Sequence, residues 1–461
     1  MSFRTELVEK VIFPLSSVRT HVRKHLSELE GTQWLTLEKL RELQWKKIGK
    51  LVHHASLEVP YYKALFNQLG LTSGRIESFE DFCKIPLLTK ESIRQNFNQL
   101  IARNYSKLEL VTRTTSGSAG APVTIVRDKK ASRIAAANQW RFKRWAGQGI
   151  GERTASIWRN TVPPQGCVAV ASRNGRLLGS RIKSWLENCL TPDLRLDPTE
   201  AMTEEAMEGF FQAIKDEDIQ ILHGYVSPLF FFAQFLLDRH EGELRMKAVR
   251  TFAEVLHPHQ RTVMERAFGC QVFNVYASRE LELIASECQH HTGLHVNAEG
   301  IFIELLDADG SPCRQGIGEI VVTDLNNYAM PLIRYQIGDI GEFSDMSCPC
   351  GRGLPLLSSV KGRTIDMLSL SDDSKVHGTV VTGFMFSHWE RVQRFRAVQK
   401  RAGEIDLFLQ FSSPPSEDLL SSIRKGLEDL TQSKLQVHTH VVDQLPLEDS
   451  GKYKFVSSEI S

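Results

Sequence analysis

The chain has 461 residues, of which 41% are hydrophobic and 24% are charged, as in ordinary globular proteins. This length exceeds one ordinary compact domain and predicts two or three. The 56 basic and 55 acidic side chains leave a formal net charge of only +1. Because nucleic-acid-binding proteins usually carry a basic excess or a basic stripe, this balance argues against that class.

The hydrophobic runs are too short for a membrane-spanning helix, which needs about 20 apolar residues. The longest one considered, at 228–237, predicts a buried helix instead. The first residues, MSFRTELVEKVIF, include acidic side chains and lack the apolar core of a secretory signal. We therefore expect a cytoplasmic protein with reduced thiols, in which the eight cysteines form no disulfide framework.

In chain order, residues 1–110 are expected to be mainly helical, with Thr89 capping one helix. An alanine-rich helix is predicted over 129–147. Its basic residues are expected on a solvated face: Lys129, Lys130, Arg133, Arg141, Lys143 and Arg144.

From 150 to 290, strand-like runs (TASIW, CVAVA, IQILHGY, CQVFNVY) alternate with helical stretches at 201–215 and 258–268. This alternation predicts an α/β layer with a largely parallel sheet. After 293, GIFIELLDADG and GEIVVTDL predict antiparallel strands. The tail, 370–461, combines the strand EIDLFLQF with a helix at 416–430, which predicts a small α+β domain.

The stretch TRTTSGSAGAP, at 112–122, lies between two β-branched runs and predicts strand, loop, strand. It lacks the GxxxxGK[ST] pattern of strand-to-helix nucleotide loops. Its glycines nevertheless allow close backbone approach, and its hydroxyls and N–H groups are donors suited to phosphate. By itself the loop favours a plain turn over a phosphate-binding role.

Four further motifs decide how this loop is interpreted. YASRE at 276–280, RYQIGD at 334–339, GRTIDML at 362–368 and SGK at 450–452 follow it in this order. Together they resemble the adenylate-forming enzymes: acyl-CoA synthetases, peptide-synthetase adenylation domains and luciferases. VPYYKALF, IPLLTKESIR, HGYVSP, CPCGR and SGKYKFV narrow the resemblance to the phenylacetate–CoA ligase branch, close to its relatives from capsule and surface-polysaccharide gene clusters.

The resemblance implies the adenylate-forming α/β fold, with a large N-terminal α/β domain, a β subdomain and a small mobile α+β C-terminal domain. The implied boundaries are 1–110 for the helical part, 111–362 for the core with the nucleotide site, 363–368 for the hinge and 369–461 for the C-terminal domain.

The implied activity is activation of a carboxylic acid by ATP, with release of pyrophosphate, followed by transfer of the acyl group. Coenzyme A is the expected acceptor. An amine, a sugar amine or a carrier-protein thiol is an alternative, and polysaccharide biosynthesis is an implied setting. A non-catalytic interaction protein stabilised by zinc is the alternative from another class.

The resemblance also implies site residues. The loop that holds the β- and γ-phosphates corresponds to Thr115, Ser116, Gly117, Ser118 and Gly120, with Ala119 and Ala121 where relatives often have threonine and lysine. Lys452 corresponds to the catalytic lysine of the C-terminal domain, placed where negative charge develops in the transition state.

The remaining nucleotide contacts are implied for Glu254 and Ser278, for Tyr276 as the aromatic on adenine, for Asp339 as the ribose acceptor, and for Arg363 as a ribose and phosphate contact. Glu280 corresponds to the Mg²⁺ ligand, an oxygen donor suited to that hard cation. Each has a structural alternative: Tyr276 is otherwise a core residue, and Glu280, in RELELIASE, otherwise lies on a charged helix face.

A zinc site is predicted from ECQHHTGLH and CPCGR. Three thiolates and one imidazole form a tetrahedral Zn²⁺ set, here Cys288, His295, Cys348 and Cys350. His290 and His291 are competing ligands, and unrelated reduced thiols are the alternative. We expect a closed, structural site that joins the loop after YASRE to the loop before GRTIDML.

Two positions depart from the usual pattern. Ile365 stands where many adenylate-forming enzymes have a charged hinge residue. Ala277 replaces a common glycine beside the acyl pocket, which predicts a small or flat acid. We expect this pocket to include Tyr225, Ala253 and Tyr276.

Overall fold

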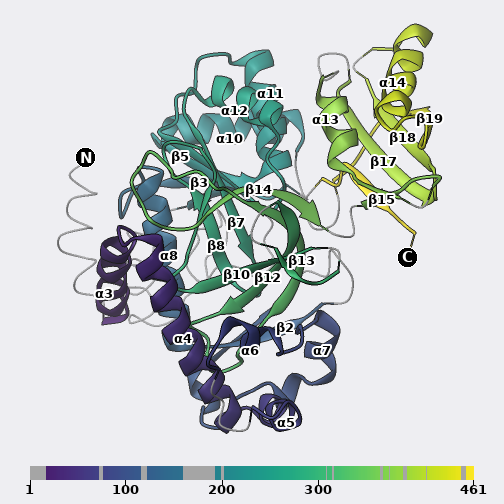
Figure 1. Cartoon of the computed structure of the whole chain (residues 1–461). Helices are drawn as coiled ribbons and strands as arrows, with labels where there is room; N and C mark the ends of the chain where they lie inside the picture. The colour runs from purple at the N-terminus through teal and green to yellow at the C-terminus, as the bar shows by residue number, and fades with distance from the viewer. Residues whose placement is uncertain are drawn as a thin grey trace.

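The computed structural model describes residues 17–71, 76–115, 122–158, 193–198, 202–307, 309–313, 316–363, 367–372, 374–387, 392–411, 413–447 and 453–460. Most of the strands form one twelve-stranded sheet, and helices pack on it (Figure 1). The sheet order is β11-β10-β12-β13-β14-β9-β8-β7-β6-β5-β3-β4. A two-stranded hairpin lies near the N-terminal helices, and the C-terminal strands form sheets of their own.

The N-terminal part is helical, as predicted. It contains α3 (Ser17–Thr32), α4 (Leu37–Glu58), α5 (Pro60–Gln68), α6 (Phe79–Cys83) and α7 (Lys90–Gln95), with 3-10 turns at Phe97–Gln99 and Lys107–Glu109. The predicted cap is confirmed, since the Thr89 hydroxyl accepts a hydrogen bond from the Ser92 N–H at the start of α7.

The Gly/Ser loop is carried on a hairpin, as the sequence predicted. β1 (Leu110–Thr114) and β2 (Thr124–Asp128) pair antiparallel. Thr115 closes the hairpin: its N–H donates to the Val123 carbonyl at 2.9 Å, and its hydroxyl accepts from the Val123 N–H at 2.9 Å. The loop residues 116–121 lie outside the described ranges.

Helix α8 (Lys129–Trp145) follows β2 and packs against α3 (Figure 1). The prediction that its basic residues form a solvated face is wrong for Arg141, which is completely buried. The Arg141 guanidinium donates to Glu299 at 2.8 Å and to Asn297 at 3.0 Å. A buried guanidinium is tolerated here because acceptors surround it, which helical spacing alone does not reveal.

The parallel part of the large sheet contains β4 (Asp193–Leu196), β3 (Thr154–Ile157), β5 (Ile221–Tyr225), β6 (Ala248–Phe252) and β7 (Val272–Ser278). Three helices pack against its apolar face: α10 (Glu204–Asp216), α11 (Val226–Arg239) and α12 (Pro258–Phe268). The predicted parallel layer is therefore confirmed, although the run CVAVA lies outside the described residues.

Helix α11 is the buried helix that the apolar run predicted. Among the helices described, none is both long enough and apolar enough to span a bilayer.

The other half of the sheet is antiparallel. Its strands are β8 (Glu282–Glu287), β9 (Leu294–Val296), β10 (Ile301–Leu306), β11 (Pro312–Cys313), β12 (Ile317–Asp324), β13 (Tyr335–Phe343) and β14 (Leu356–Arg363). The predicted antiparallel pairing of 301–306 with 317–324 is confirmed. RELELIASE forms a turn, which contains Glu280, followed by strand β8, so the alternative of a charged helix face is wrong.

The described residues from 367 to 460 form what we call the C-terminal lobe. It contains the hairpin β15 (Met367–Ser369) and β16 (Lys375–His377), helix α13 (Thr379–Ser387) and helix α14 (Glu417–Leu430). A four-stranded sheet has the order β19 (Gln436–Val441), β18 (Glu404–Gln410), β17 (Arg394–Arg401), β20 (Val456–Ser458).

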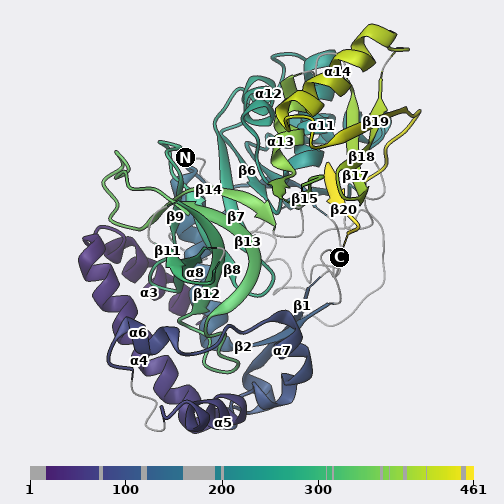
Figure 2. The ribbon, with the colours of Figure 1, turned by 45° about the vertical axis from the view of Figure 1, so that its right-hand side comes forward.

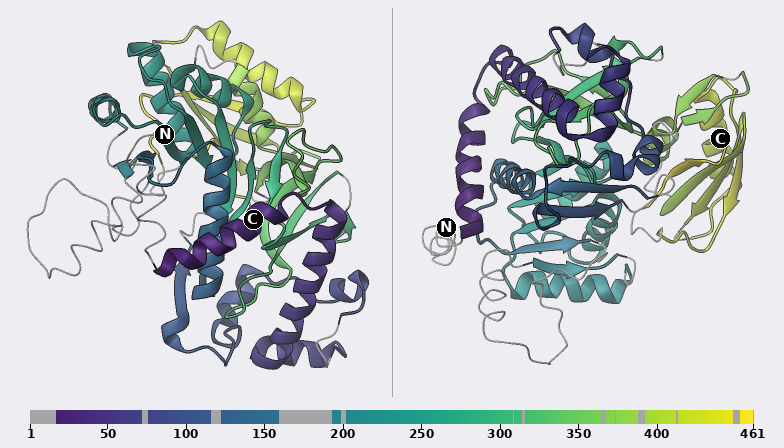
Figure 3. Two further views of the ribbon diagram at one scale, coloured as in Figure 1. Left: turned by 90° about the vertical axis from the view of Figure 1, so that its left-hand side faces the viewer. Right: turned by 90° about the horizontal axis from the view of Figure 1, so that it is seen from below.

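The lobe has its own apolar core, in which Ile405, Leu407 and Leu409 are buried as their alternation predicted. Phe230 and Phe231 of α11 pack into the same core, so the lobe rests against the α11 side of the large sheet (Figure 2). Two further views show the lobe beside the large sheet, not as an extension of it (Figure 3).

Candidate active site and metal centre

Three of the residues predicted to bind nucleotide come together at the end of β7. Tyr276 on β7 donates its hydroxyl to the Asp339 carboxylate on β13, at 2.6 Å. Arg363, the last residue of β14, pairs with Asp339 in the strand register, and its Nε lies 3.6 Å from the same carboxylate. These residues are up to 87 positions apart in the sequence (363 minus 276), and the folding of the sheet brings their side chains together.

The electrostatics of this group reflect burial. Burial raises the pKa of the Asp339 carboxyl, and this outweighs the lowering by Arg363 and by the hydrogen bond from Tyr276. Burial, followed by the negative charge of Asp339, raises the pKa of the Tyr276 hydroxyl well above its usual range. The phenol therefore stays a neutral donor.

A cavity of about 220 Å³ lies over this group, between the large sheet and the C-terminal lobe. Its lining includes four predicted site residues, Glu254, Tyr276, Asp339 and Arg363. From the lobe it is lined by segments that include His377 and Tyr453.

Gly362 adjoins Arg363 in this lining and must be glycine. Its φ is +125°, and a Cβ atom there would lie 2.7 Å from the His377 ring. The close approach of β14 to the lobe thus depends on the glycine of the GRTIDML motif.

Glu254 links the two sides of the cavity. It follows Ala253, whose φ of +70° is unusual for alanine and turns the chain directly after β6. One Glu254 oxygen accepts from the Ser227 N–H at 2.6 Å, and the other accepts from the Tyr453 N–H at 3.1 Å. The side chain therefore fixes the segment that starts at Tyr453 against the start of α11.

Glu280 lies in a separate buried environment just after β7. Its carboxylate accepts from the Tyr335 hydroxyl at 3.0 Å, and its backbone carbonyl accepts from Arg127 Nη1 at 3.1 Å. Ser278, at the end of β7, accepts from the Leu281 N–H at 3.1 Å and so shapes the turn that carries Glu280. After burial, the negative charge of Glu280 also contributes to the raised pKa of Asp339.

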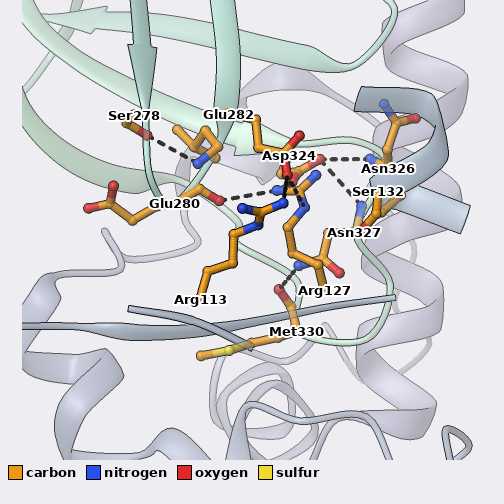
Figure 4. Close-up of polar contacts among 12 residues, drawn as sticks. Arg113, Arg127, Ser132, Ser278, Glu280, Glu282, Asp324, Asn326, Asn327 and Met330 are labelled. Carbon is orange, nitrogen blue, oxygen red and sulfur yellow. Dashed lines mark hydrogen bonds and ion pairs between the residues drawn. The ribbon is translucent and has the colours of Figure 1, made fainter. Parts of the chain in front are cut away.

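The side chain that organises this region is Arg127 of β2 (Figure 4). It is 3% exposed and forms an ion pair with Asp324, which is 2% exposed, at 2.9 Å. Its Nε lies 3.9 Å from Glu282, and Glu282 in turn pairs with Arg113 of β1 at 3.3 Å. The two strands that flank the Gly/Ser loop are thereby tied to the turn of Glu280 (Figure 4).

The sequence interpretation missed Arg127, Asp324 and Tyr335. Tyr335 is part of the RYQIGD motif, but the motif does not show that its hydroxyl contacts Glu280. Arg127 carries a weak signal, a lone cation in a β-branched run, and its acidic partner is nearly 200 positions away (324 minus 127). Only the fold supplies that pairing.

Several predicted residues lie outside the described part of the chain: Ser116, Gly117, Ser118, Ala119, Gly120, Ala121, Ile365 and Lys452. Two described residues adjoin these segments: Thr115 lies at the base of the hairpin, and Tyr453 lines the cavity.

The four predicted zinc ligands converge. The donor atoms of Cys288, His295, Cys348 and Cys350 all lie within 4.8 Å of one another. The sulfurs of Cys288 and Cys348 are 3.5 Å apart, and Cys350 Sγ lies 3.3 Å from His295 Nε2. A tetrahedral site with Zn–S bonds of about 2.3 Å has S···S edges of about 3.8 Å, so these separations suit a single ion.

The local backbone supports the cluster. The Gly351 N–H donates to the Cys348 carbonyl at 3.1 Å, and Gly351 has φ +78°, which closes a tight turn through CPCG. The Arg352 N–H points to Cys350 Sγ at 3.5 Å. His291, an alternative ligand in the sequence interpretation, instead contacts Glu287 at 3.0 Å.

Comparison with known proteins places this geometry in context. No protein-family profile matches the chain. It is 25% identical over 380 residues to the phenylacetate-coenzyme A ligase of Thermus thermophilus, covering 81% of each chain. It is 22% identical over 430 residues to protein CapK of Staphylococcus aureus, covering 91% of this chain and 90% of CapK.

Solved structures share the fold at lower identity. A 2-hydroxyisobutyryl-CoA ligase in the postadenylation state, bound to R3-HIB-AMP, superposes with a TM-score of 0.69 at 16% identity, covering 90% of this chain and 88% of that one. The o-succinylbenzoate coenzyme A synthetase of Bacillus subtilis, bound to ATP and magnesium, gives 0.50 at 16% identity, covering 75% and 68%. The chain has the fold of the adenylate-forming coenzyme A ligases, and its sequence is similar to the phenylacetate–coenzyme A ligases and to CapK.

Proposed function

We propose that this chain is an AMP-forming acid ligase that adenylates a carboxylic acid and then transfers the acyl group to coenzyme A. The observation that carries the proposal is the meeting of Tyr276, Asp339 and Arg363 at one cavity, beside the C-terminal segment at Tyr453. The similarity to phenylacetate–coenzyme A ligases supports the same conclusion.

The reaction has two balanced steps. A carboxylate oxygen of the acid bonds to the α-phosphorus of ATP, the bond from that phosphorus to the bridging oxygen breaks, and pyrophosphate leaves. The thiol of coenzyme A then bonds to the acyl carbon and loses its proton, and AMP leaves. Both steps bring anions together, so the site needs cations and hydrogen-bond donors.

In this proposal the Asp339 carboxylate accepts the ribose hydroxyls, Arg363 contacts ribose and phosphate, and the Tyr276 ring stacks on adenine. Lys452 contributes its ammonium group between the acid and the α-phosphate. Supporting this placement, the adjacent Tyr453 lines the cavity and is held there by Glu254.

The phosphate-holding role belongs to the loop from Thr115 to Gly120, with the hairpin base as its fixed support. Glu280 is the proposed Mg²⁺ ligand, and its fixed backbone and single hydroxyl partner leave carboxylate lone pairs for a cation. Magnesium, when bound, would neutralise phosphate charge there.

A structural zinc ion is proposed at Cys288, His295, Cys348 and Cys350. The donor chemistry and the separations of the four atoms fit one tetrahedral ion without an open position. The site would join the turn after β8 and strand β9 to the loop between β13 and β14, which leads into Arg363.

The test is pyrophosphate release from ATP across a panel of carboxylic acids, with and without coenzyme A. Release that depends on one acid supports adenylation, and faster turnover with coenzyme A supports the thioester product. If an added amine gives an amide product and coenzyme A has no effect, the acceptor is an amine and not coenzyme A.

The matched variants are Asp339→Asn and Glu342→Gln, on the same strand. Glu342 pairs with Lys361 at 3.2 Å, away from Tyr276. Since a hydrogen bond to a charged group contributes about 1.5–3 kcal/mol, Asp339→Asn should lower kcat/KM for ATP about 10- to 100-fold. Equal rates for the two variants would contradict the assignment of Asp339.

A further inference from the structure

A row of polar side chains crosses the parallel sheet on the face opposite its apolar core. In the strand register Arg195 of β4 lies beside Ser156 of β3, Ser156 beside His223 of β5, and His223 beside Arg250 of β6. Neighbouring residues at one register position of a sheet point to the same face. The next positions along two of these strands, Leu222 and Val249, belong to the apolar core on the other face.

The row is rich in cations and contains one carboxylate, Asp193, among the described residues. Asp193 is already engaged: it accepts from the hydroxyls of Thr154 and Ser156 and pairs with Arg195, each at 2.9 Å. Its direct contacts are therefore made to β3 and Arg195, and its charge also acts on His223 and Lys143.

Arg250 is the side chain that this arrangement leaves unexplained. It is 2% exposed, yet its Nε and Nη2 have no hydrogen-bond partner among the described residues. Its guanidinium lies 5.1 Å from the Phe252 ring centroid. Burying a cation without a partner is costly, so an anionic ligand that met Arg250 would remove this cost.

Lys143 of α8 adds a second positive charge to this region. Burial, followed by the charge of the nearby Arg250, lowers its pKa to about 8, while Asp193 opposes the shift. The part of the chain that the structure describes gives its ammonium no direct carboxylate partner, and it lies 4.5 Å from the Trp140 ring centroid. Two cations thus share this region with one described carboxylate, Asp193, which already pairs with Arg195.

The row leads toward the candidate active site. Arg250 precedes Ala253, which lines the cavity, by three strand positions, a distance of about 10 Å. Between them lie aromatic side chains: Trp158 and Tyr225, with ring centroids 4.4 Å apart, and Phe252, 5.7 Å from Trp158. Ligands of parallel sheets bind at the carboxyl ends of the strands, where these aromatic residues stand.

We propose that Arg250 and Lys143 form an anion subsite for a second acidic group on the carboxylic acid substrate, on the far side of Trp158, Tyr225 and Phe252 from Ala253. The inference rests on the proposed function and specifies its substrate class: an acid with two anionic groups. One carboxylate reacts at the nucleotide cavity, and the other pairs with Arg250.

The test compares dicarboxylates with their own monoamides, which keep the length and the reacting carboxylate but lose one charge. Glutarate, adipate, suberate and isophthalate form the panel, and ATP-dependent pyrophosphate release is measured with the full chain. The wild type is expected to favour one dicarboxylate over its monoamide by about tenfold or more in kcat/KM, because a built polar site rejects a ligand that leaves it unpaired. In Arg250→Met the ratio should fall to about one.

A binding arm separates failure of this inference from failure of the proposed function. Calorimetric titration of the same acids into the full chain needs no turnover. Binding of a dicarboxylate that Arg250→Met abolishes supports the subsite even if no acid releases pyrophosphate. The subsite inference is overturned if a diacid and its monoamide bind equally, or if no diacid binds. It is also overturned if coenzyme A or inorganic phosphate, and no diacid, binds in a way that depends on Arg250.

Stability gives an independent readout. Replacing a buried, unpaired cation with an apolar side chain of similar length removes a desolvation cost, so Arg250→Met should unfold in urea no more easily than the wild type. Arg195→Met is the contrasting variant, because it leaves Asp193 without its cation and should be less stable. If Arg250→Met is the destabilised variant, Arg250 has a structural role and the inference is wrong. Arg250→Gln, which keeps a donor, repeats the acid comparison if the methionine variant does not fold.

Discussion

The buried Arg127–Asp324 ion pair is expected to contribute strongly to the stability of the fold around the candidate site. Asp324→Asn keeps the size of the side chain and its acceptor oxygen for the N–H groups of Asn326 and Asn327, which lie 3.0 and 3.3 Å away. It removes only the negative charge 2.9 Å from Arg127. The guanidinium would then remain buried with Glu282, at 3.9 Å, as its nearest carboxylate.

The size of the effect follows from the burial of both partners. At an effective dielectric constant of about 20, two charges 2.9 Å apart attract each other by roughly 6 kcal/mol, part of which the desolvation cost offsets. Breaking such a pair on one side typically costs about 3–5 kcal/mol, because the remaining charge stays buried. Since the asparagine retains its backbone contacts, we expect Asp324→Asn to lower the free energy of unfolding by about 3 kcal/mol.

Arg113→Met is the matched control. Arg113 pairs with Glu282 of the same cluster at 3.3 Å, but its side chain is 46% exposed. Exposed pairs contribute about 0–1 kcal/mol, so this variant should unfold close to the wild type. Urea unfolding followed by circular dichroism compares the two. A cost for Asp324→Asn no larger than that for Arg113→Met would refute the argument that burial controls the strength of this cluster.

Three further predictions concern metal, pH and the hairpin. Metal analysis should find about one zinc per chain, lost in Cys350→Ser and kept in Cys270→Ser; a folded, metal-free wild type would contradict the site. Burial raises the pKa of Glu299, but attraction to Arg141 and the hydrogen bonds from Arg141 and Thr32 together outweigh it and leave the pKa lowered. The contribution of the Glu299 carboxylate to stability is therefore full above the unfolded pKa and is lost as the pH falls through the folded pKa. In urea unfolding, Glu299→Gln should therefore destabilise the protein more at about pH 7 than at about pH 4. An equal loss of stability at both pH values would exclude this linkage. Thr115→Val removes the hydroxyl that accepts from Val123 and should raise KM for ATP several-fold with little change in unfolding, whereas an unchanged KM would separate the hairpin base from phosphate binding.

The sequence by itself determined the character of the segments. Alternating β-branched runs, Thr89 as a helix cap and the apolar run of α11 specify local structure because backbone conformation and side-chain periodicity act over a few residues. The motifs YASRE, RYQIGD and GRTIDML also marked Tyr276, Asp339 and Arg363 before any contact between them was known. The residues of CPCGR and ECQHHTGLH, together with the resemblance to the phenylacetate–CoA ligase branch, predicted the four-donor cluster.

The tertiary structure decided which of these residues meet and which charges are buried. Arg141 has the helical spacing of a surface residue, yet α3 and Glu299 enclose it. Arg127 and Asp324 pair across nearly 200 positions of sequence (324 minus 127), and two nitrogens of the buried Arg250 meet no acceptor in the part of the chain that the structure describes. Such facts are absent from local sequence because desolvation and Coulomb attraction depend on distances through space, and only the order of strands in the sheet sets those distances.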